Sequence, residues 1–272
     1  MKVTIRPFDT DDLSAAFELS SAEGWNQTLR DWQRLIEYDP VGCFAAVDGD
    51  QLVGTVTTTR YGTRLAWIGM MLVASTHRRQ GIAIRLMERA VSFLTAAGVA
   101  CIRLDATPVG RTVYERLKFV ADLDLHRWSR GSTEPMPQLT PGPQQPQSLP
   151  LPLDAQAFGV DRRRWLQRLV PDSVVSVVDG GFGLLRCGRL ASYLGPITAD
   201  SEAAARTIID RLLSGVDGPV FWDIPKLNQA AERMADELGF QPVRDLTRMT
   251  LGGPPPDADL TKQFALADPG TG

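Results

Sequence analysis

Histidine and cysteine are scarce in this chain of 272 residues, which holds two histidines and three cysteines. His77 and His126 lie far apart in the sequence, and no Cys/His cluster has the spacing of a zinc site. We therefore expect no metal, and metal-dependent hydrolysis is a disfavoured function. An odd number of cysteines at wide spacing favours buried thiols over disulfides.

The sequence also lacks any apolar run of roughly 18 to 20 residues, the length that crosses a bilayer, and it begins without the apolar core of a signal peptide. We expect a cytoplasmic protein that does not bind membranes. The net charge of -3 argues against a nucleic-acid partner, because phosphate affinity needs an excess of Lys and Arg along one face. A small anionic ligand can still be held locally.

What the chain does contain is the composition of a globular protein, with 43% hydrophobic and 22% charged residues. Residues 131–153 form a stretch rich in Pro, Gln, Ser and Gly that cannot pack a core, so we predict a linker there. It separates a first domain at 1–130 from a second at 154–272, which ends in an extended tail. Phe264 to Ala267 in that tail are apolar enough to dock on the second domain.

Each half reads as strands mixed with helices, which predicts an α/β (mixed α+β) fold with a central mixed sheet. In the first half, Asp48-Gly49 marks a hairpin and 65–73 (LAWIGMMLV) is a continuous apolar run, as in a strand covered on both faces. Apolar residues then repeat at helical spacing from Gly81 to 94, and Gly98 ends that helix. Thr28 and Asp31 predict a capping box at the start of an earlier helix.

The most informative stretch runs from residue 70 to 90, where the apolar strand passes through a short polar turn into that amphipathic helix. The first backbone N–H groups of a helix have no partner within it, so they point together at one place with partial positive charge. Gly81 lets a phosphate approach the backbone, and Arg78 and Arg79 add charge. The stretch has neither the lysine ending of a nucleotide-hydrolase loop nor the glycines of a dinucleotide fingerprint, so ATP and NAD are disfavoured.

The pattern Val73-(x4)-Arg78-x-x-Gly81-x-Ala83 resembles the acyl-CoA signature of the GCN5-related N-acetyltransferases, the GNAT family. The resemblance implies that acetyl-CoA is the co-substrate. It implies that the strand backbone pairs with the pantetheine arm and that the helix start binds the pyrophosphate. In this chain the strand residues are Met71, Leu72 and Val73, and the helix start consists of Arg78, Arg79, Gln80, Gly81, Ile82 and Ala83.

A second family pattern, Asn-x-x-Ala-x-x-x-Tyr-x-x-x-Gly-Phe, is similar to the stretch from Thr107 to Phe119, which includes Gly110, Tyr114 and Lys118. The resemblance implies that Tyr114 lies beside the sulfur of the coenzyme and acts as a general acid toward the leaving thiolate. The resemblance also implies that Thr107 and Gly110 contact the coenzyme, although Thr107 replaces the Asn and Lys118 replaces the Gly of the family pattern.

An amine acceptor must be neutral to attack a thioester, and because a free alkylamine has a pKa near 10.4, a base or a water chain is needed. Asp105 is our candidate for this base, with Glu23 as a weaker one. Trp25 and Trp222 are candidate acceptor contacts alongside Glu23. The longer resemblance is to two-domain bacterial GNAT proteins, through Gly24-Trp25-Asn26, residues 68–73 and residues 104–108.

The second half repeats the order of strands and helices and the motif spacing of the first half, but key motif residues are replaced. Asn228 and Phe240 have the same separation as Thr107 and Phe119, but Ala235 replaces the tyrosine. Residues 203–205 are alanines at the position that corresponds to the helix start at Arg78 to Ala83, and no glycine follows, so we expect this copy not to hold coenzyme A. The prediction is a tandem of GNAT folds, an intramolecular pseudo-dimer that exists as a monomer or a homodimer.

The function predicted from these features is an N-acyltransferase that moves an acetyl group from acetyl-CoA to a primary amine on a small molecule or a peptide. The alternative is a non-catalytic sensor or scaffold that binds acyl-CoA, with Tyr114 merely packing. Acceptor identity is set by pocket shape, which no motif reports.

Overall fold

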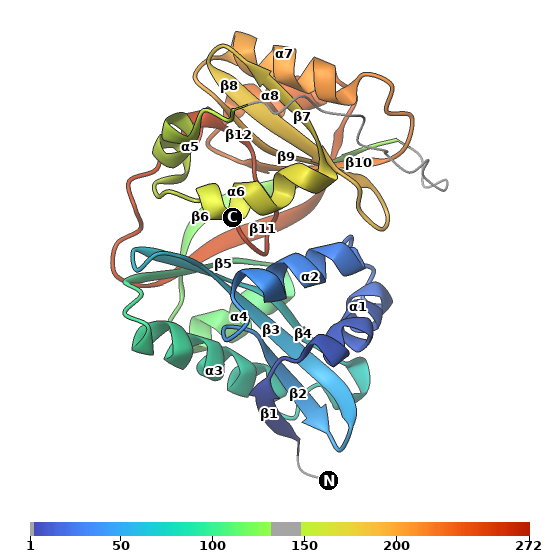
Figure 1. The fold of residues 1–272 in the computed structure, drawn as a ribbon, viewed down its shortest axis with the longest axis vertical. Coiled ribbons are helices and arrows are strands. Elements are labelled where there is room, and N and C mark those ends of the chain that lie inside the picture. Colours follow the sequence, from blue (N-terminus) through green and yellow to red (C-terminus); the bar gives the residue numbers. More distant parts are fainter. Residues whose placement is uncertain (1–2, 132–147) are drawn as a thin grey trace. The chain divides into compact units, whose positions relative to one another are not determined.

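The computed structural model describes residues 3–131 and 148–272, and these form two compact units (Figure 1). The first unit contains Met1–Ala121, Met249–Pro255 and Thr271, and the second contains Asp122–Arg248, Pro256–Gly270 and Gly272. Most of the predicted linker, residues 132–147, lies outside the described residues. None of the helices in the described ranges is long and apolar enough to cross a membrane.

The first unit is built on a mixed sheet that runs in the order β1-β2-β3-β4-β5-β11. Successive neighbours from β1 to β4 are antiparallel, whereas β4 and β5 are parallel. The strands are β1 (Thr4–Pro7), β2 (Phe44–Asp48), β3 (Gln51–Tyr61), β4 (Leu65–Val73), β5 (Cys101–Ala106) and β11 (Gln241–Gly252), of which residues 249–252 belong to this unit.

Helices cover both faces of this sheet, with α1 and α2 on one side and α3 on the other (Figure 1). The apolar face of α3 packs on β2, β3 and β4, which explains why the run over β4 is continuous. The helical elements are η1 (Thr10–Asp12), α1 (Leu13–Ala22), α2 (Leu29–Tyr38), η2 (Ser75–His77), α3 (Ile82–Ala96) and α4 (Pro108–Arg116).

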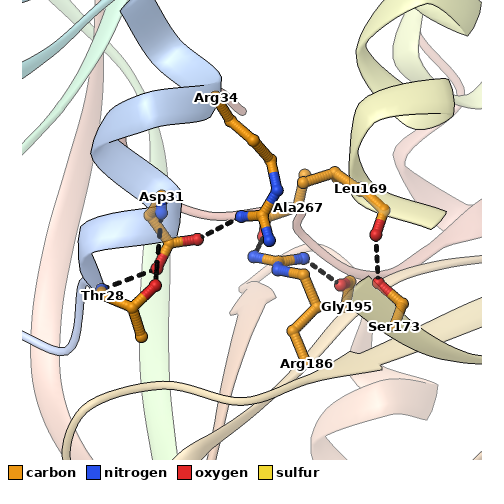
Figure 2. A network of polar contacts seen from close by, with 8 residues as sticks. All are labelled: Thr28, Asp31, Arg34, Leu169, Ser173, Arg186, Gly195 and Ala267. Carbon is orange, nitrogen blue, oxygen red and sulfur yellow. Dashed lines mark hydrogen bonds and ion pairs between the residues drawn. The ribbon is translucent and has the colours of Figure 1, made fainter. Parts of the chain in front are cut away.

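The capping box predicted at the start of α2 is confirmed. The Asp31 amide donates to Thr28 Oγ1 at 3.2 Å, and the Thr28 amide donates to Asp31 Oδ2 at 2.7 Å. Figure 2 shows these two residues together with Arg34, whose Nη1 donates to Asp31 Oδ1 at 2.5 Å. These contacts fix where α2 begins after the loop that carries Gly24-Trp25-Asn26.

The second unit repeats the plan with the strand order β11-β6-β10-β9-β8-β7, and a further strand, β12, pairs with β9. The strands are β6 (Val120–Arg130), β7 (Ser173–Val178), β8 (Gly181–Arg186), β9 (Ser192–Ala199), β10 (Val220–Pro225) and β12 (Gln263–Ala265). The helical elements are α5 (Leu151–Phe158), α6 (Arg163–Leu169), η3 (Val170–Asp172), α7 (Glu202–Leu213), α8 (Gln229–Glu237) and η4 (Leu260–Lys262).

The division of the chain differs from the boundaries expected at residues 130 and 154. From Asp122 onward β6 belongs to the second unit, where it pairs antiparallel with β10 from Leu125↔Pro225 to Arg130↔Val220. In return, residues 249–255 belong to the first unit, where the Gly253 amide donates to the Ala100 oxygen at 2.7 Å. Each unit therefore contains a strand segment from the opposite half of the sequence, and no local pattern marks this exchange.

The three cysteines are free thiols, but they are not equally buried. Cys43 and Cys101 are buried, and burial raises the pKa of the Cys43 thiol to about 12. Cys187 follows β8 and is half-exposed, so the expectation of a buried thiol is wrong for this residue.

Candidate functional site

The strand-to-helix turn between β4 and α3 has the backbone geometry of an anion site. Gly81 is the N-cap of α3 and has a left-handed φ of 76°, and Arg79 also has a positive φ of 63°. A Cβ built on Gly81 would meet no other atom within 4 Å, so the space beside the first turn is open. The first amides of α3 have no partner within the helix. An anion can approach these amides at Gly81 without meeting a side chain.

Arg78 is held at the edge of this turn by two contacts. Its Nε donates to the Val73 oxygen at 3.1 Å, and its Nη2 pairs with the carboxylate of Glu23. Glu23 is the C-cap of α1, so the pair joins the start of the α1–α2 loop to the end of β4. Both residues are candidates from the sequence, but no local pattern links two positions that are 55 residues apart.

The two parallel strands at the centre of the first unit pair only at their starts. The pairing runs from Leu65↔Cys101 to Trp67↔Arg103, and the strands then continue to Val73 and Ala106 without further pairing between described residues. Met71, Leu72 and Val73 lie in this unpaired part of β4. Their edge toward β5 therefore offers backbone groups to an extended ligand, because Leu72 and Val73 pair only at the opposite edge, with β3.

The register between β3 and β4 shifts between Gly69 and Leu72, so Met71 lies within the irregularity. Met70 has a positive φ of 47°, and its oxygen accepts a hydrogen bond of 2.8 Å from Thr55 Oγ1. Met71 is half-buried, whereas Met70 and Leu72 are buried. The irregularity re-aims the end of β4, as β-bulges do next to functional sites.

Tyr114 lies on α4, which follows β5 directly. Thr107 is the N-cap of this helix, and its Oγ1 accepts from the Gly110 amide at 3.2 Å. The Tyr114 ring packs edge-on against Phe119 with centroids 6.2 Å apart, and a Cβ on Gly110 would lie 3.1 Å from the tyrosine ring. Burial raises the pKa of Tyr114 to about 12, so its hydroxyl keeps its proton at neutral pH.

The other candidate residues occupy different surroundings. Asp105 lies near the end of β5 and is half-buried, and Trp25 is half-buried in the α1–α2 loop. Trp222 is fully buried in the core of the second unit, where its indole packs on Phe240 with centroids 5.4 Å apart. Trp222 is therefore a core residue, and we remove it from the candidate acceptor contacts.

Two hydroxyls of the first unit were not singled out from the sequence. The Oγ1 atoms of Thr57 and Thr59 are buried and have no hydrogen-bond partner among the described residues. The two residues lie opposite Gly69 and Trp67 on β4. Unsatisfied buried hydroxyls are uncommon, and the three consecutive threonines at 57–59 were the available signal.

The second unit has neither the open helix start nor the tyrosine of the first unit. Ser201 is the N-cap of α7 and its side chain accepts from the Ala204 amide at 3.3 Å, so the first turn is capped by its own serine. Ala235 lies fully buried on α8 at the place of the tyrosine. In the ranges that the structure covers, His, Cys, Asp and Glu side chains form no group that could hold a metal.

Comparison with known proteins places both halves in one family. Residues 10–119 match the model described as acetyltransferase (GNAT) family, and residues 151–265 match the model described as acetyltransferase (GNAT) domain. The chain is 28% identical over 243 residues, 85% of each chain, to the uncharacterized N-acetyltransferase YitH of Bacillus subtilis (strain 168).

Two solved structures share the fold over nearly the whole chain. A candidate acetyltransferase from Pyrococcus horikoshii is 24% identical with a TM-score of 0.86, over 99% of this chain and 96% of that one. A GCN5-related N-acetyltransferase from Sphaerobacter thermophilus is 13% identical with a TM-score of 0.63, over 94% and 98%. These likenesses show the fold of the tandem.

Proposed function

Because the chain belongs to the GNAT acetyltransferases and carries two such domains in tandem, we propose that its first unit transfers an acetyl group from acetyl-CoA to a primary amine. The observation that carries the proposal is the open turn at Gly81, which follows a strand whose edge toward β5 is free of pairing from Ile68 to Val73. A phosphate site and an unpaired strand edge, in this order, suit a ligand with a diphosphate at one end and an amide-bearing arm at the other.

The residues present fit such a ligand. The first amides of α3 and the side chains of Arg78 and Arg79 would hold the pyrophosphate, and the backbone of Met71 to Val73 would pair with the pantetheine arm. On binding, a phosphate would replace the Glu23 carboxylate as the partner of Arg78, because both are anions that a guanidinium binds. Thr107, whose Oγ1 accepts from the Gly110 amide at the start of α4, would contact the coenzyme together with Gly110.

The bound thioester supplies an electrophilic carbonyl and a thiolate leaving group. A backbone N–H near Val73 would stabilise negative charge on the carbonyl oxygen, and the Tyr114 hydroxyl would donate its proton to the departing sulfur. A raised pKa suits this role, because the phenol remains protonated throughout the range in which the amine loses its proton.

Asp105 is the proposed acceptor of the amine's proton, directly or through water. It lies on the strand adjacent to β4 and is half-buried, so a carboxylate there is accessible to water. Glu23 is the weaker candidate for this base, because its carboxylate pairs with Arg78. Trp25, in the loop after Glu23, is the proposed apolar contact of the acceptor, which is a small-molecule or peptide amine.

The test is release of free thiol from acetyl-CoA on addition of pooled amines. We expect release that depends on the amine and falls by about 100-fold or more in Tyr114→Phe, the effect of losing a general acid. Val109→Ala, at an exposed position of the same helix, should leave the rate unchanged. The wild-type rate should rise with pH as the amine deprotonates, and Tyr114 should produce no falling limb up to about pH 10.

Saturable binding of acetyl-CoA without turnover for any amine would instead identify a sensor or scaffold. If acetyl-CoA does not bind at millimolar concentration, both the acetyltransferase and the sensor or scaffold are excluded.

A further inference from the structure

The strands β9 and β10 of the second unit separate in the same way as β4 and β5 do in the first. Their parallel pairing covers three residues on each strand, from Ser192↔Val220 to Leu194↔Trp222. Both strands then continue, β9 to Ala199 and β10 to Pro225. In the first unit this is the position proposed for the pantetheine arm, and the inference below rests on that proposed function.

In the second unit this position is taken by the chain itself. The strand β12 pairs antiparallel with β9 at Gln263↔Thr198 and Ala265↔Ile197. On the other side the Leu266 amide donates to the Asp223 oxygen of β10 at 3.0 Å. The segment therefore makes backbone hydrogen bonds to both strands just beyond the point where they stop pairing with each other.

Side chains of the second unit also bind the backbone of this segment. Trp222 Nε1 donates to the Phe264 oxygen at 2.7 Å in the buried core. Arg186 Nη1 donates to the Gly195 oxygen at 2.6 Å and Nη2 to the Ala267 oxygen at 2.7 Å, so one guanidinium ties the end of the segment to β9. Figure 2 shows Arg186 between these two oxygens.

Asn228 makes the comparison with the first unit specific. Its Oδ1 accepts from the Ala231 amide at 3.0 Å and caps α8, as Thr107 caps α4. Its Nδ2 donates to the oxygens of Thr261 at 3.1 Å and Gln263 at 3.0 Å. A residue at the position of a proposed cofactor contact thus binds peptide carbonyls of the chain's own C-terminal segment.

Apolar contacts complete the fit. Phe264 is 2% exposed and belongs to the core cluster that contains Trp222 and Phe240. Leu266 is 1% exposed and packs with two leucines of the second unit, Leu125 and Leu246. A Cβ on Gly195 would lie 2.0 Å from the Leu266 oxygen, so β9 carries a glycine where the segment passes closest.

From these contacts we infer that the second copy of the fold is a strand-binding site whose ligand is an extended peptide, occupied in cis by residues 260–267. Affinity comes from main-chain hydrogen bonds to two diverging strands, and specificity comes from a buried aromatic residue followed by small and aliphatic ones. In the second copy the segment fills the position that corresponds to the one proposed for the pantetheine arm in the first copy.

The test cuts the chain near the end of the segment 249–255, before the residues that occupy the site. A protease recognition sequence is inserted between Pro254 and Pro255, which are exposed, and the full chain is cleaved under native conditions. We expect the C-terminal piece to stay bound in native mass spectrometry and to exchange with a labelled synthetic peptide of residues 257–270. The same peptide with Phe264→Asp should not bind.

Asn228→Asp provides the matched variant, because the carboxylate keeps the α8 cap but replaces the donor with an acceptor facing two carbonyls. We expect it to release the piece at least 10-fold faster. In the uncut wild type, the Leu266 amide should be protected from hydrogen exchange. Immediate loss of the cleaved piece with an unchanged melting temperature, or a Leu266 amide that exchanges as fast as that of exposed Asp257, would overturn the inference.

None of these measurements uses acetyl-CoA or an amine. A failure of amine-dependent thiol release would therefore remove the proposed function without changing the outcome here. A failure of peptide binding would leave the catalytic proposal standing.

Discussion

At the scale of single residues, the two copies of the fold meet the same backbone requirement with different side chains. Lys118 follows α4 with a φ of 70°, and Gly239 follows α8 with a φ of 79°. The amide after each one donates to the same place on its helix, Phe119 to the Tyr114 oxygen and Phe240 to the Ala235 oxygen. Glycine adopts this left-handed conformation without penalty and lysine does not.

We therefore predict that Lys118→Gly raises the free energy of unfolding by about 1 kcal/mol, because it removes a strained left-handed residue. Gly239→Lys, at the equivalent position of the other copy, should lower it by a similar amount. Both are measured by chemical denaturation. No change for Lys118→Gly would mean that local contacts of the lysine offset its strain.

The burial of Tyr114 has two effects, because it packs the ring in the core and raises the pKa of the hydroxyl. A tyrosine that packs against Phe119 serves as a core residue, and the same packing raises its pKa to about 12 and keeps the proton on the hydroxyl. In the second copy the position is a fully buried alanine, which packs without a hydroxyl. The loss of the tyrosine ring is thus one of the differences between the two copies, together with the serine-capped start of α7 and the strand β12 beside β9.

At the scale of elements, the N-terminus of α3 is the feature on which the proposed binding of acetyl-CoA depends. Both ends of this helix have a left-handed glycine, Gly81 at the start and Gly98 after the end, and an added Cβ meets open space at each. The backbone strain of a substitution is therefore similar at the two positions. Their difference is that only Gly81 lies beside the free amides of the first turn.

We predict that Gly81→Val weakens acetyl-CoA binding by at least about 10-fold, since a branched side chain would stand where the phosphates approach the amides. Gly98→Val should cost similar stability and leave the affinity unchanged. Calorimetric titration with acetyl-CoA measures the first effect and thermal unfolding the second. Equal affinities for the two variants would exclude the turn as the phosphate site.

At the scale of the whole molecule, the exchange of strand segments makes each unit depend on the other half of the sequence. Arg103 on β5 donates from Nε to Thr250 Oγ1 at 3.3 Å, and the Gly253 amide binds the oxygen of Ala100. Both partners in these contacts belong to the first unit although about 150 residues separate them. The first unit is therefore incomplete when the chain stops after the first half.

We predict that a fragment of residues 1–130 fails to fold as a monomer, because β5 loses the strand beside it and β6 loses β10. A fragment that joins residues 1–121 to 249–255 through a short Gly-Ser linker should be folded and bind acetyl-CoA. Circular dichroism and gel filtration measure the folding of both. A stable, monomeric 1–130 fragment would contradict the exchange.

By itself, the sequence determined the features that depend on neighbours in the chain. The capping box at Thr28, the buried run over β4, the left-handed glycine at the start of α3 and the repeated helix after Asn228 are all set by local propensity and spacing. The tandem of GNAT folds followed from motifs of the same kind. The expected docking of Phe264 to Ala267 on the second domain is also confirmed.

Only the tertiary structure decided the features that join distant positions. These are the Arg78–Glu23 pair, the burial of Trp222 in a core, the exchange of β6 and β11, and the insertion of β12 beside β9. Strand order and long-range ion pairs depend on which surfaces remain unpaired once the sheets form, and the pattern of residues along one strand says nothing about its partner.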